Sequence, residues 1–478
     1  YKKYSQSFCK IRNNDIKNTL LNSSAAREHE GTFCPEPLIQ INPHYEISTT
    51  VPDLISDGSL HQRCKDIFKF KDKPMSLYAH QAQAISYARD KKDFIVTTGT
   101  GSGKSLAFFI PIVDRVLREK EKDSIPRTRA IVIYPMNALA NSQMQELNKF
   151  LDNLQGAFSF GIYTGQEGDA ERSRIAKNPP DILLTNFMMM ELLLTRHNEN
   201  DSRVIENCRG LEFLVLDELH TYRGRQGADV AMLIRRLRER TQAKDLICIG
   251  TSATMSNVGS ENDQEIAVKE TGRLLFGTQE LPAVVTERLQ LVTDSKLDIE
   301  HIRPQLAARA MEFAAGKASL TSFEDFKEDP LAVWLERTLG VEYSGNNLPK
   351  RATPISLSIA AEKLQKDAVN GGLSHENAQK AILNFLLDTY NLAAPDGSKS
   401  PFAFKLHQFI GAPGKLYLSL EQAGKRAVSR NMFPVKQTTG FASIPHIFAG
   451  NAVRNSCLCG MTLNWIRICQ ERLMIPEP

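Results

Sequence analysis

The sequence has 478 residues, of which 42% are hydrophobic and 24% charged, and this composition excludes a wholly disordered, collagen-like or coiled-coil chain. Lysine and arginine (59) nearly balance aspartate and glutamate (55), so the net charge of +4 excludes binding of a polyanion by bulk charge alone. No apolar run reaches the roughly 18 residues of a membrane helix, and the first residues lack the apolar core of a secretory signal. We therefore expect a soluble, cytoplasmic chain with no membrane partner and without disulfides.

Four regions follow one another along the chain. Residues 1–60 carry prolines at positions 35, 37, 43 and 52, which predict an irregular N-terminal arm. Residues 61–280 alternate continuous apolar runs with helical stretches, a pattern typical of an α/β domain with a parallel sheet and helices on both faces. Residues 281–435 predict a mainly helical accessory module. Residues 436–478 have no clear period and are expected to be an irregular tail.

A glycine-rich turn follows the apolar run at 94–96 and precedes an apolar helix. A strand, a glycine-rich turn and a Lys-Ser pair that opens a helix form a phosphate loop, although the strict pattern has glycine where this chain has Thr98. Glycines let backbone N–H groups converge on phosphate oxygens. Lys104 would neutralise the β- and γ-phosphates, and the Ser105 hydroxyl would ligate Mg²⁺. The nucleotide-binding residues are predicted to be Thr98, Gly99, Thr100, Gly101, Ser102, Gly103, Lys104 and Ser105.

A second apolar run, residues 213–216, ends in the acidic sequence Asp217-Glu218-Leu219-His220. A buried strand that delivers two carboxylates to its end is costly unless a metal ion and a water meet them there. We predict that Asp217 holds Mg²⁺, directly or through water, and that Glu218 accepts the proton of the attacking water. With Lys104, these are the predicted catalytic residues.

The phosphate loop and D-E-L-H together resemble the DEAD/DEAH-box helicases of superfamily two. The resemblance implies a RecA-like fold, ATP as the nucleotide, and Gln81 as the residue that reads adenine. It extends to Tyr134–Ala140 and Thr185-Asn186, which resemble the two nucleic-acid-contacting motifs, and to Ser252-Ala253-Thr254. It assigns nucleic-acid contacts to Pro135, Asn137, Ala138, Thr185 and Asn186. It assigns the coupling of hydrolysis to movement to His220, Ser252 and Thr254.

Two further expectations concern the substrate and the neighbouring residues. Thr221–Gly224 and the helix at 228–240 resemble long bacterial helicases related to Mrf-type DNA-repair enzymes, which implies DNA rather than RNA. The chain is therefore predicted to be the first motor domain of an ATP-dependent helicase or translocase. The methionine run 188–190 is predicted to be core, because such runs more often pack than bind.

A superfamily-two motor hydrolyses ATP between two such domains, and the second supplies arginines. The nearest match here, Gln422–Arg430, lacks the preceding strands. We expect that this chain alone binds ATP but hydrolyses it poorly, and that the intact protein has a second motor domain. A frameshifted tail after about residue 436 would explain the arrangement. The helical module would serve protein partners.

Two alternatives to a motor remain open at this point. The chain could act as a truncated, non-motor module that binds ATP and nucleic acid, or as an unrelated phosphate-loop enzyme such as a nucleotide kinase, which D-E-L-H and S-A-T disfavour. In the tail, Cys457, Cys459 and Cys469 fall short of four well-spaced metal ligands, so packing is favoured over a metal site.

Overall fold

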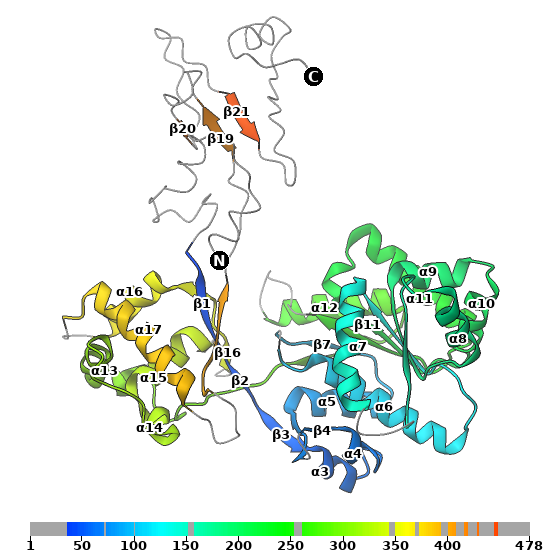
Figure 1. The fold of residues 1–478 in the computed structure, drawn as a ribbon, viewed down its shortest axis with the longest axis horizontal. Helices are drawn as coiled ribbons and strands as arrows, with labels where there is room; N and C mark the ends of the chain where they lie inside the picture. Colours follow the sequence, from blue (N-terminus) through cyan, green and yellow to red (C-terminus); the bar gives the residue numbers. More distant parts are fainter. Residues whose placement is uncertain are drawn as a thin grey trace, which may run out of the picture. The chain divides into compact units, whose positions relative to one another are not determined.

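The computed structural model describes residues 36–70, 73–99, 101–151, 157–252, 261–343, 349–368, 372–392 and 400–407 and short strands within 415–447. The chain forms two compact units (Figure 1). We call residues 44–290 the sheet unit, and residues 1–43 with 291–478 the helical unit. The predicted tail and residues 422–430, the segment compared above with the arginine motif of a second motor domain, lie outside the described residues. The exceptions are the strands β20 (Val428–Ser429) and β21 (Ile444–Ile447).

The sheet unit is built on a seven-stranded sheet whose neighbouring strands all run parallel. Its central strands are buried along their whole length, as expected when both faces are covered. The prediction of a parallel sheet is confirmed. In sheet order the strands are β13 (Ala283–Thr286), β7 (Phe94–Thr97), β12 (Ile247–Ser252), β11 (Phe213–Leu216), β8 (Ala130–Tyr134), β10 (Ile182–Asn186) and β9 (Phe160–Tyr163).

Helices cover both faces of this sheet, as predicted (Figure 1). Successive residues of β7 divide between two cores, because side chains of a strand alternate between its faces: Phe94 and Val96 pack in one core and Ile95 in the other. One face carries α5 (Ala79–Arg89), α6 (Lys104–Lys122) and α7 (Asn137–Leu151). The other carries α8 (Asp169–Lys177), α9 (Phe187–Thr195), α10 (Glu199–Glu206), α11 (Gly224–Arg240) and α12 (Glu261–Phe276).

The sheet unit extends further along the chain than the predicted 61–280. The segment before residue 60 was expected to be irregular because of its prolines, yet it contains β3 (Ile47–Thr50) and α3 (Val51–Ser56). Pro52 lies in the first turn of α3, where a missing N–H breaks no helical bond, and the Thr50 hydroxyl accepts from Asp53 N to cap the helix. A proline there begins a helix. The element α4 (Cys64–Ile67) and strand β6 (Ser76–Tyr78) complete this region.

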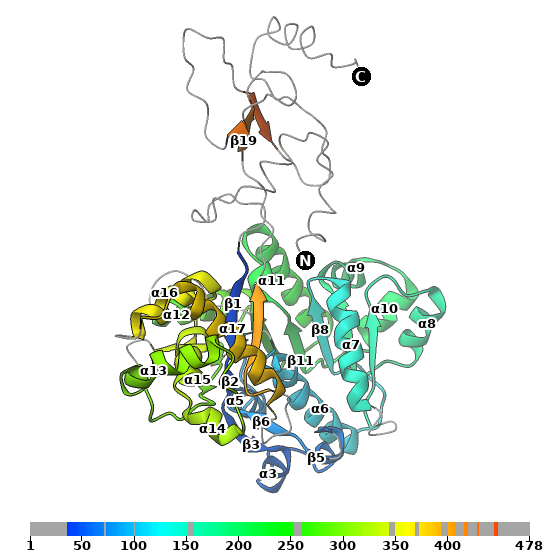
Figure 2. The same ribbon diagram turned by 60° about the vertical axis from the view of Figure 1, so that its left-hand side comes forward.

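The helical unit is mainly helical, as predicted, but it also contains a small antiparallel sheet. Trp334 is fully buried at the centre of its core, and the indole donates to Asp367 Oδ2 at 2.8 Å. The sheet order is β17 (Ile355–Ser356), β1 (Leu38–Asn42) and β18 (Ala403–His407), so the middle strand comes from the N-terminal region. Figure 2 shows β18, in orange, beside the blue β1. The helices are α13 (Ile299–Ala314), α14 (Phe323–Glu328), α15 (Pro330–Leu335), α16 (Leu357–Asp367) and α17 (His375–Asn391).

The chain passes between the two units twice, and the passages lie next to each other in the sheet unit. Strand β2 (His44–Tyr45) pairs antiparallel with β14 (Leu289–Gln290). The boundaries of the sheet unit fall directly at these strands, before His44 and after Gln290. Directly after the second connection, in the helical unit, the buried Glu336 carboxylate accepts hydrogen bonds from Val292 N at 2.8 Å and from Thr293 N at 2.9 Å. A strand pair therefore carries both connections.

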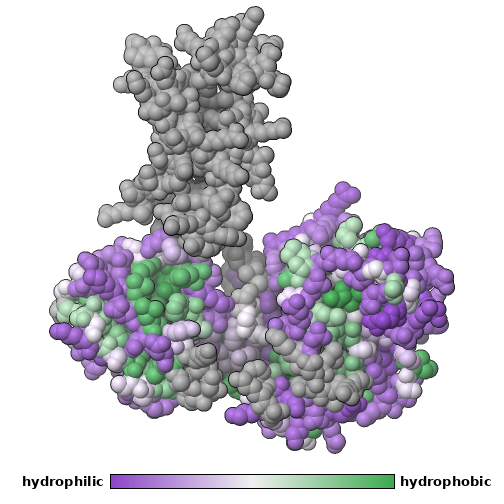
Figure 3. All heavy atoms as spheres, viewed as in Figure 1, coloured by the Kyte–Doolittle hydropathy of each residue, from purple (hydrophilic) through white to green (hydrophobic). Residues whose placement is uncertain are grey.

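One side of α17 exposes apolar residues to solvent. Leu383, Leu387 and Tyr390 follow one another at spacings of four and three residues, which places them on one helix face, and they are 44%, 63% and 63% exposed. A hydrophobic patch is visible on the helical unit in the space-filling view (Figure 3).

Among the described residues, no helix combines the length and the apolar character needed to cross a membrane.

Candidate nucleotide and nucleic-acid site

The phosphate loop connects β7 to α6, which begins at Lys104. Gly101 and Gly103 have φ values of 85° and 71°, a left-handed conformation that glycine adopts without strain. A Cβ atom at Gly103 would lie 2.6 Å from the Gln81 Nε2 atom, so a larger residue there would have to displace the Gln81 side chain. Thr100 lies outside the described residues.

Thr98 stands where the strict phosphate-loop pattern has glycine. Its hydroxyl oxygen lies 2.6 Å from the Ser102 hydroxyl oxygen, and both side chains are buried. The hydroxyl therefore forms a hydrogen bond across the base of the loop, which stabilises the turn. This contact explains why threonine is accommodated at position 98.

Helix α5 holds the loop from the side through two carbonyl groups. The His80 Nε2 atom lies 2.9 Å from Ser102 O, and Gln81 Nε2 donates to Gly103 O at 3.1 Å. Burial lowers the pKa of His80, which favours the neutral ring with its N–H directed to the carbonyl. The Gln81 side chain is buried and its Oε1 accepts from Tyr78 N. Adenine recognition by Gln81 stays a prediction, and the loop contact is a role that the sequence did not indicate.

Lys104 faces the acidic residues across the site. Its Nζ atom lies 3.9 Å from Glu218 Oε1, and the two side chains are 13% and 25% exposed. The Nζ atom is buried and has no hydrogen-bond partner among the described residues. A buried ammonium group without hydrogen bonds is costly, and phosphate oxygens would satisfy it. The position fits the predicted contact of Lys104 with a triphosphate.

The acidic residues follow β11 at the same edge of the sheet. Glu218 has φ 54°, an uncommon conformation for a non-glycine residue that typically costs about 1–3 kcal/mol and recurs at functional sites. Thr251, at the end of the neighbouring β12, ties both carboxylate residues together: its hydroxyl donates to Asp217 Oδ1 and accepts from Glu218 N at 3.1 Å. Burial raises the pKa of Asp217, and the Thr251 hydrogen bond opposes that rise. Thr251 was missed in the sequence, although it directly precedes S-A-T.

Two of the predicted coupling residues meet at the acidic sequence. The His220 Nδ1 atom lies 3.1 Å from Glu218 Oε2 and 3.5 Å from the Ser252 hydroxyl oxygen. Because β11 and β12 are neighbours, motifs that lie 32 residues apart come into contact. Thr254 lies outside the described residues, so its role stays a prediction.

The predicted nucleic-acid residues gather at the ends of β8 and β10, which are also neighbours. Asn186 Nδ2 donates to Asn137 Oδ1 at 2.5 Å, and Asn186 Oδ1 accepts from Met189 N to cap α9. Thr185 is fully buried and its hydroxyl donates to Tyr163 O at 2.6 Å. Pro135 is half-buried beside Asn137, and Ala138 is exposed. The structure therefore brings the two motifs together, and contact with a strand stays a prediction for each residue.

Exposed methionines flank this asparagine pair. Met189 and Met190 are buried in the core, as predicted. The prediction is wrong for Met188, which is 64% exposed, because the first turn of α9 projects it away from the sheet; Met136 is 58% exposed. Neither was identified from the sequence, where methionine signals packing. Flexible apolar side chains at this place suit contact with bases or sugars.

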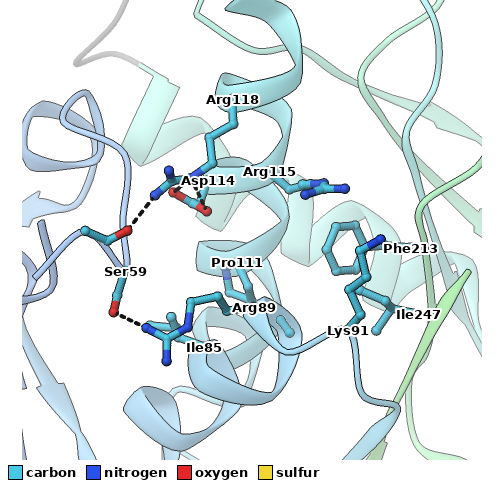
Figure 4. Close-up of a pocket in the computed structure, with 12 residues that line it drawn as sticks. Ser59, Ile85, Arg89, Lys91, Pro111, Asp114, Arg115, Arg118, Phe213 and Ile247 are labelled. Atoms are coloured by element: carbon cyan, nitrogen blue, oxygen red, sulfur yellow. Dashed lines mark hydrogen bonds and ion pairs between the residues drawn. The ribbon is translucent and has the colours of Figure 1, made fainter. Parts of the chain in front are cut away.

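Two cavities lie in the sheet unit away from the phosphate loop. One of about 250 Å³ borders Phe213 and Ile247, the first residues of β11 and β12, and so lies at the opposite edge of the sheet (Figure 4). Its arginines are engaged by protein groups: Arg89 donates to Ser59 and Arg118 to Asp114. It is therefore separate from the strand ends that carry the phosphate loop and the acidic sequence. The other, of about 820 Å³, lies between α11 and α12 beside the acidic sequence.

The described residues contain no cluster of three or more His, Cys, Asp or Glu side chains arranged to hold a metal ion. This is compatible with Mg²⁺ bound by Ser105 and Asp217, because Mg²⁺ commonly takes one or two protein ligands together with phosphate oxygens and water. The buried carboxyl group of Asp217 also fits, since a cation would offset its desolvation.

Comparison with known proteins gives a family match that lies within the sheet unit. A family model described as DEAD/DEAH box helicase matches residues 78–261. The uncharacterized ATP-dependent helicase YprA of Bacillus subtilis is 33% identical over 183 residues, covering 38% of this chain and 23% of the relative. The Druantia protein DruE of Escherichia coli is 25% identical over 380 residues, covering 54% and 20%. This chain thus spans about a fifth to a quarter of these relatives.

Among solved structures, the DUF1998 helicase MrfA bound to DNA is similar with a TM-score of 0.41 and 25% sequence identity, over 63% of this chain and 38% of that chain. The DEAD-box helicase Mss116 bound to single-stranded RNA is similar with a TM-score of 0.43 and 18% identity, over 56% of this chain and 55% of that chain.

Proposed function

We propose that the chain is the ATP-binding motor part of an ATP-dependent nucleic-acid helicase or translocase, on the premise that residues 78–261 match the DEAD/DEAH box helicase family. The observation that carries the proposal is the meeting of Lys104 and Glu218 at 3.9 Å beside the phosphate loop. These residues follow two strands that are not neighbours in the sheet, β7 and β11, and they face one another where a triphosphate would bind.

Each residue has a role in this proposal. Backbone N–H groups of the phosphate loop bind phosphate oxygens, and Lys104 neutralises their charge. Glu218 takes the proton of the attacking water, and its left-handed backbone, fixed by Thr251, aims the carboxylate into the site. Bound Mg²⁺, held by Ser105 and Asp217, would neutralise charge on the phosphates. His220 links Glu218 to Ser252 and would transmit the state of the site.

We propose single-stranded DNA rather than RNA as the strand that the motor tracks, on the resemblance of Thr221–Gly224 to Mrf-type helicases. Contacts near Asn137 and Asn186 would be to the backbone, so base identity should matter little. The test is ATP hydrolysis with and without DNA and RNA oligonucleotides of one sequence. Stimulation by DNA several-fold above RNA is expected. Turnover that ignores both nucleic acids would contradict the motor, and turnover that needs a small phosphate acceptor would indicate a kinase.

The active site would be completed by arginines of a second motor domain in the intact protein, as the resemblance to superfamily two implies. Restoring such a domain should raise DNA-dependent turnover; in GTPases a supplied arginine is worth roughly 10³- to 10⁵-fold. ATP turnover at full helicase rates by this chain alone would refute that part. If ATP binds without turnover even in the intact protein, the alternative of a non-motor module that binds ATP and nucleic acid would hold.

We also propose that the helical unit binds a helix of a protein partner along the exposed stripe Leu383, Leu387 and Tyr390. Spacings of four and three residues match the apolar seam of one helix packed on another. The change Leu387→Asp should abolish co-purification of the partner without altering the thermal unfolding midpoint, whereas Asn377→Asp, exposed near the start of the same helix and off the face of the stripe, should retain the partner. Equal retention by both variants would refute this surface.

A cytoplasmic location is proposed on the state of the cysteines. Cys64, Cys208 and Cys248 are free and buried in the sheet unit, and burial raises the pKa of each thiol, which keeps it protonated and unreactive. Free buried thiols are typical of proteins from reducing compartments. Cell fractionation tests this, and recovery of the protein outside the cytoplasmic fraction would contradict it.

A further inference from the structure

A carboxylate from the edge of the sheet is bonded to the phosphate loop. Glu287 directly follows β13, and its Oε2 atom accepts from the backbone N–H of Gly99 at 2.8 Å. Two residues before Gly99, the Thr97 hydroxyl donates to Val285 O at 3.3 Å. The start of the loop is therefore held to β13 by two hydrogen bonds, and one of them comes from a charged group.

The same residue stands next to the strand pair that joins the two units. Two residues after Glu287 begins β14, which pairs with β2. The neighbouring Arg288 carbonyl accepts from Glu46 N at 2.9 Å and extends that pairing. Any displacement of Glu287 would thus act directly on the strands through which the chain leaves the sheet unit on both sides.

The negative charge of Glu287 lies at the loop where the negatively charged phosphates of a nucleotide would bind. Its carboxylate acts on the buried His80 as well as on the loop, since its negative charge favours the protonated ring and partly opposes the effect of burial on the pKa of His80. A nucleotide at the loop brings several negative charges into the same half-buried place. Like charges in a site of reduced dielectric repel one another, and the repulsion grows with the number of phosphates.

We propose that Glu287 is a positioning residue that holds the phosphate loop while no nucleotide is bound. The phosphates of a bound nucleotide displace its carboxylate, and this movement couples nucleotide binding to the strand pair β2–β14. The inference rests on the proposed ATP site. It predicts that the carboxylate weakens nucleotide binding in proportion to phosphate charge, at a place outside the motifs by which the domain was identified.

The test compares Glu287→Gln with Glu287→Ala in the full chain. Glutamine keeps an oxygen that can accept from Gly99 N, so it removes the charge and retains the contact. Affinities are measured for ATP, ADP and adenosine. Glu287→Gln should bind ATP on the order of ten-fold more tightly, ADP less so, and adenosine as the unchanged chain does. The control Glu239→Gln, exposed near the end of α11, should alter none of them.

Hydrogen exchange supplies a second readout. In the unchanged chain, ATP should speed exchange of the amides at 44–46 and 288–290, and in Glu287→Ala exchange there should be fast without ATP. Equal changes for all three ligands in Glu287→Gln, or unchanged ATP affinity, would overturn the inference while leaving the ATP site intact. Failure of the unchanged chain to bind ATP would overturn the proposed function and this inference with it.

Discussion

Replacing Glu218 by glutamine is expected to lower ATP turnover by roughly 10²- to 10⁴-fold, the usual contribution of a general base. Glutamine matches the shape of glutamate but does not take up a proton, and the backbone contact of residue 218 with Thr251 does not involve the changed side chain. Nucleotide binding should therefore be retained. Phosphate release and equilibrium nucleotide titration are measured side by side with DNA present.

The matched control for this experiment is Glu239→Gln, which removes the same charge from an exposed position on α11. It should hydrolyse ATP at the rate of the unchanged chain. Turnover by Glu218→Gln equal to that of the control would exclude Glu218 as the base. Loss of nucleotide binding in Glu218→Gln would mean that the carboxylate instead serves to hold Lys104, its neighbour at 3.9 Å.

Replacing Lys104 by alanine is expected to weaken ATP binding and turnover together, by about 10²-fold or more, because charged donors aimed at reacting oxygens contribute on that order. The effect should depend on the phosphates. Lys104 is predicted to face the β- and γ-phosphates, so ATP and ADP should lose affinity and AMP should lose little. Titration with the three nucleotides measures this directly.

Lys177→Ala serves as the control, since Lys177 is exposed on α8. A uniform loss of affinity for ATP, ADP and AMP in Lys104→Ala would indicate a disturbed loop rather than a lost phosphate contact. That result is separable by thermal unfolding: Lys104 has no hydrogen bond among the described residues, so its removal should leave the midpoint unchanged or raised.

The parts of the site that the sequence could predict are contiguous along the chain. Lys104 and Ser105 belong to one loop, and Asp217 and Glu218 to one strand end, so local pattern was sufficient to place them. Thr251 and Glu287 act through partners more than thirty residues away, Asp217 and Gly99 respectively. No local pattern records such contacts, and their residue types are common in loops and strand ends.

The strands of the fold were likewise predictable where they form a continuous local pattern in the sequence. The five central strands read as continuous apolar runs, whereas the edge strands β9 and β13 are partly exposed and mix apolar with other residues, so their signal is weak. The prolines before residue 60 were read as breaks, but Pro52 begins a helix. Strand β1 was missed because its partners, β17 and β18, lie more than 300 residues away.

That last pairing has a consequence for synthesis of the chain. Leu38 pairs with His407, so β1 leaves the ribosome long before either of its partner strands exists. At about 5–20 residues per second, the wait is on the order of tens of seconds. The whole of the sheet unit, residues 44–290, is translated within that interval and can fold first. During the wait, β1 presents unpaired backbone groups and the apolar side chains of Ile39 and Ile41, so this short segment can pair with another chain until its own partner strands are made.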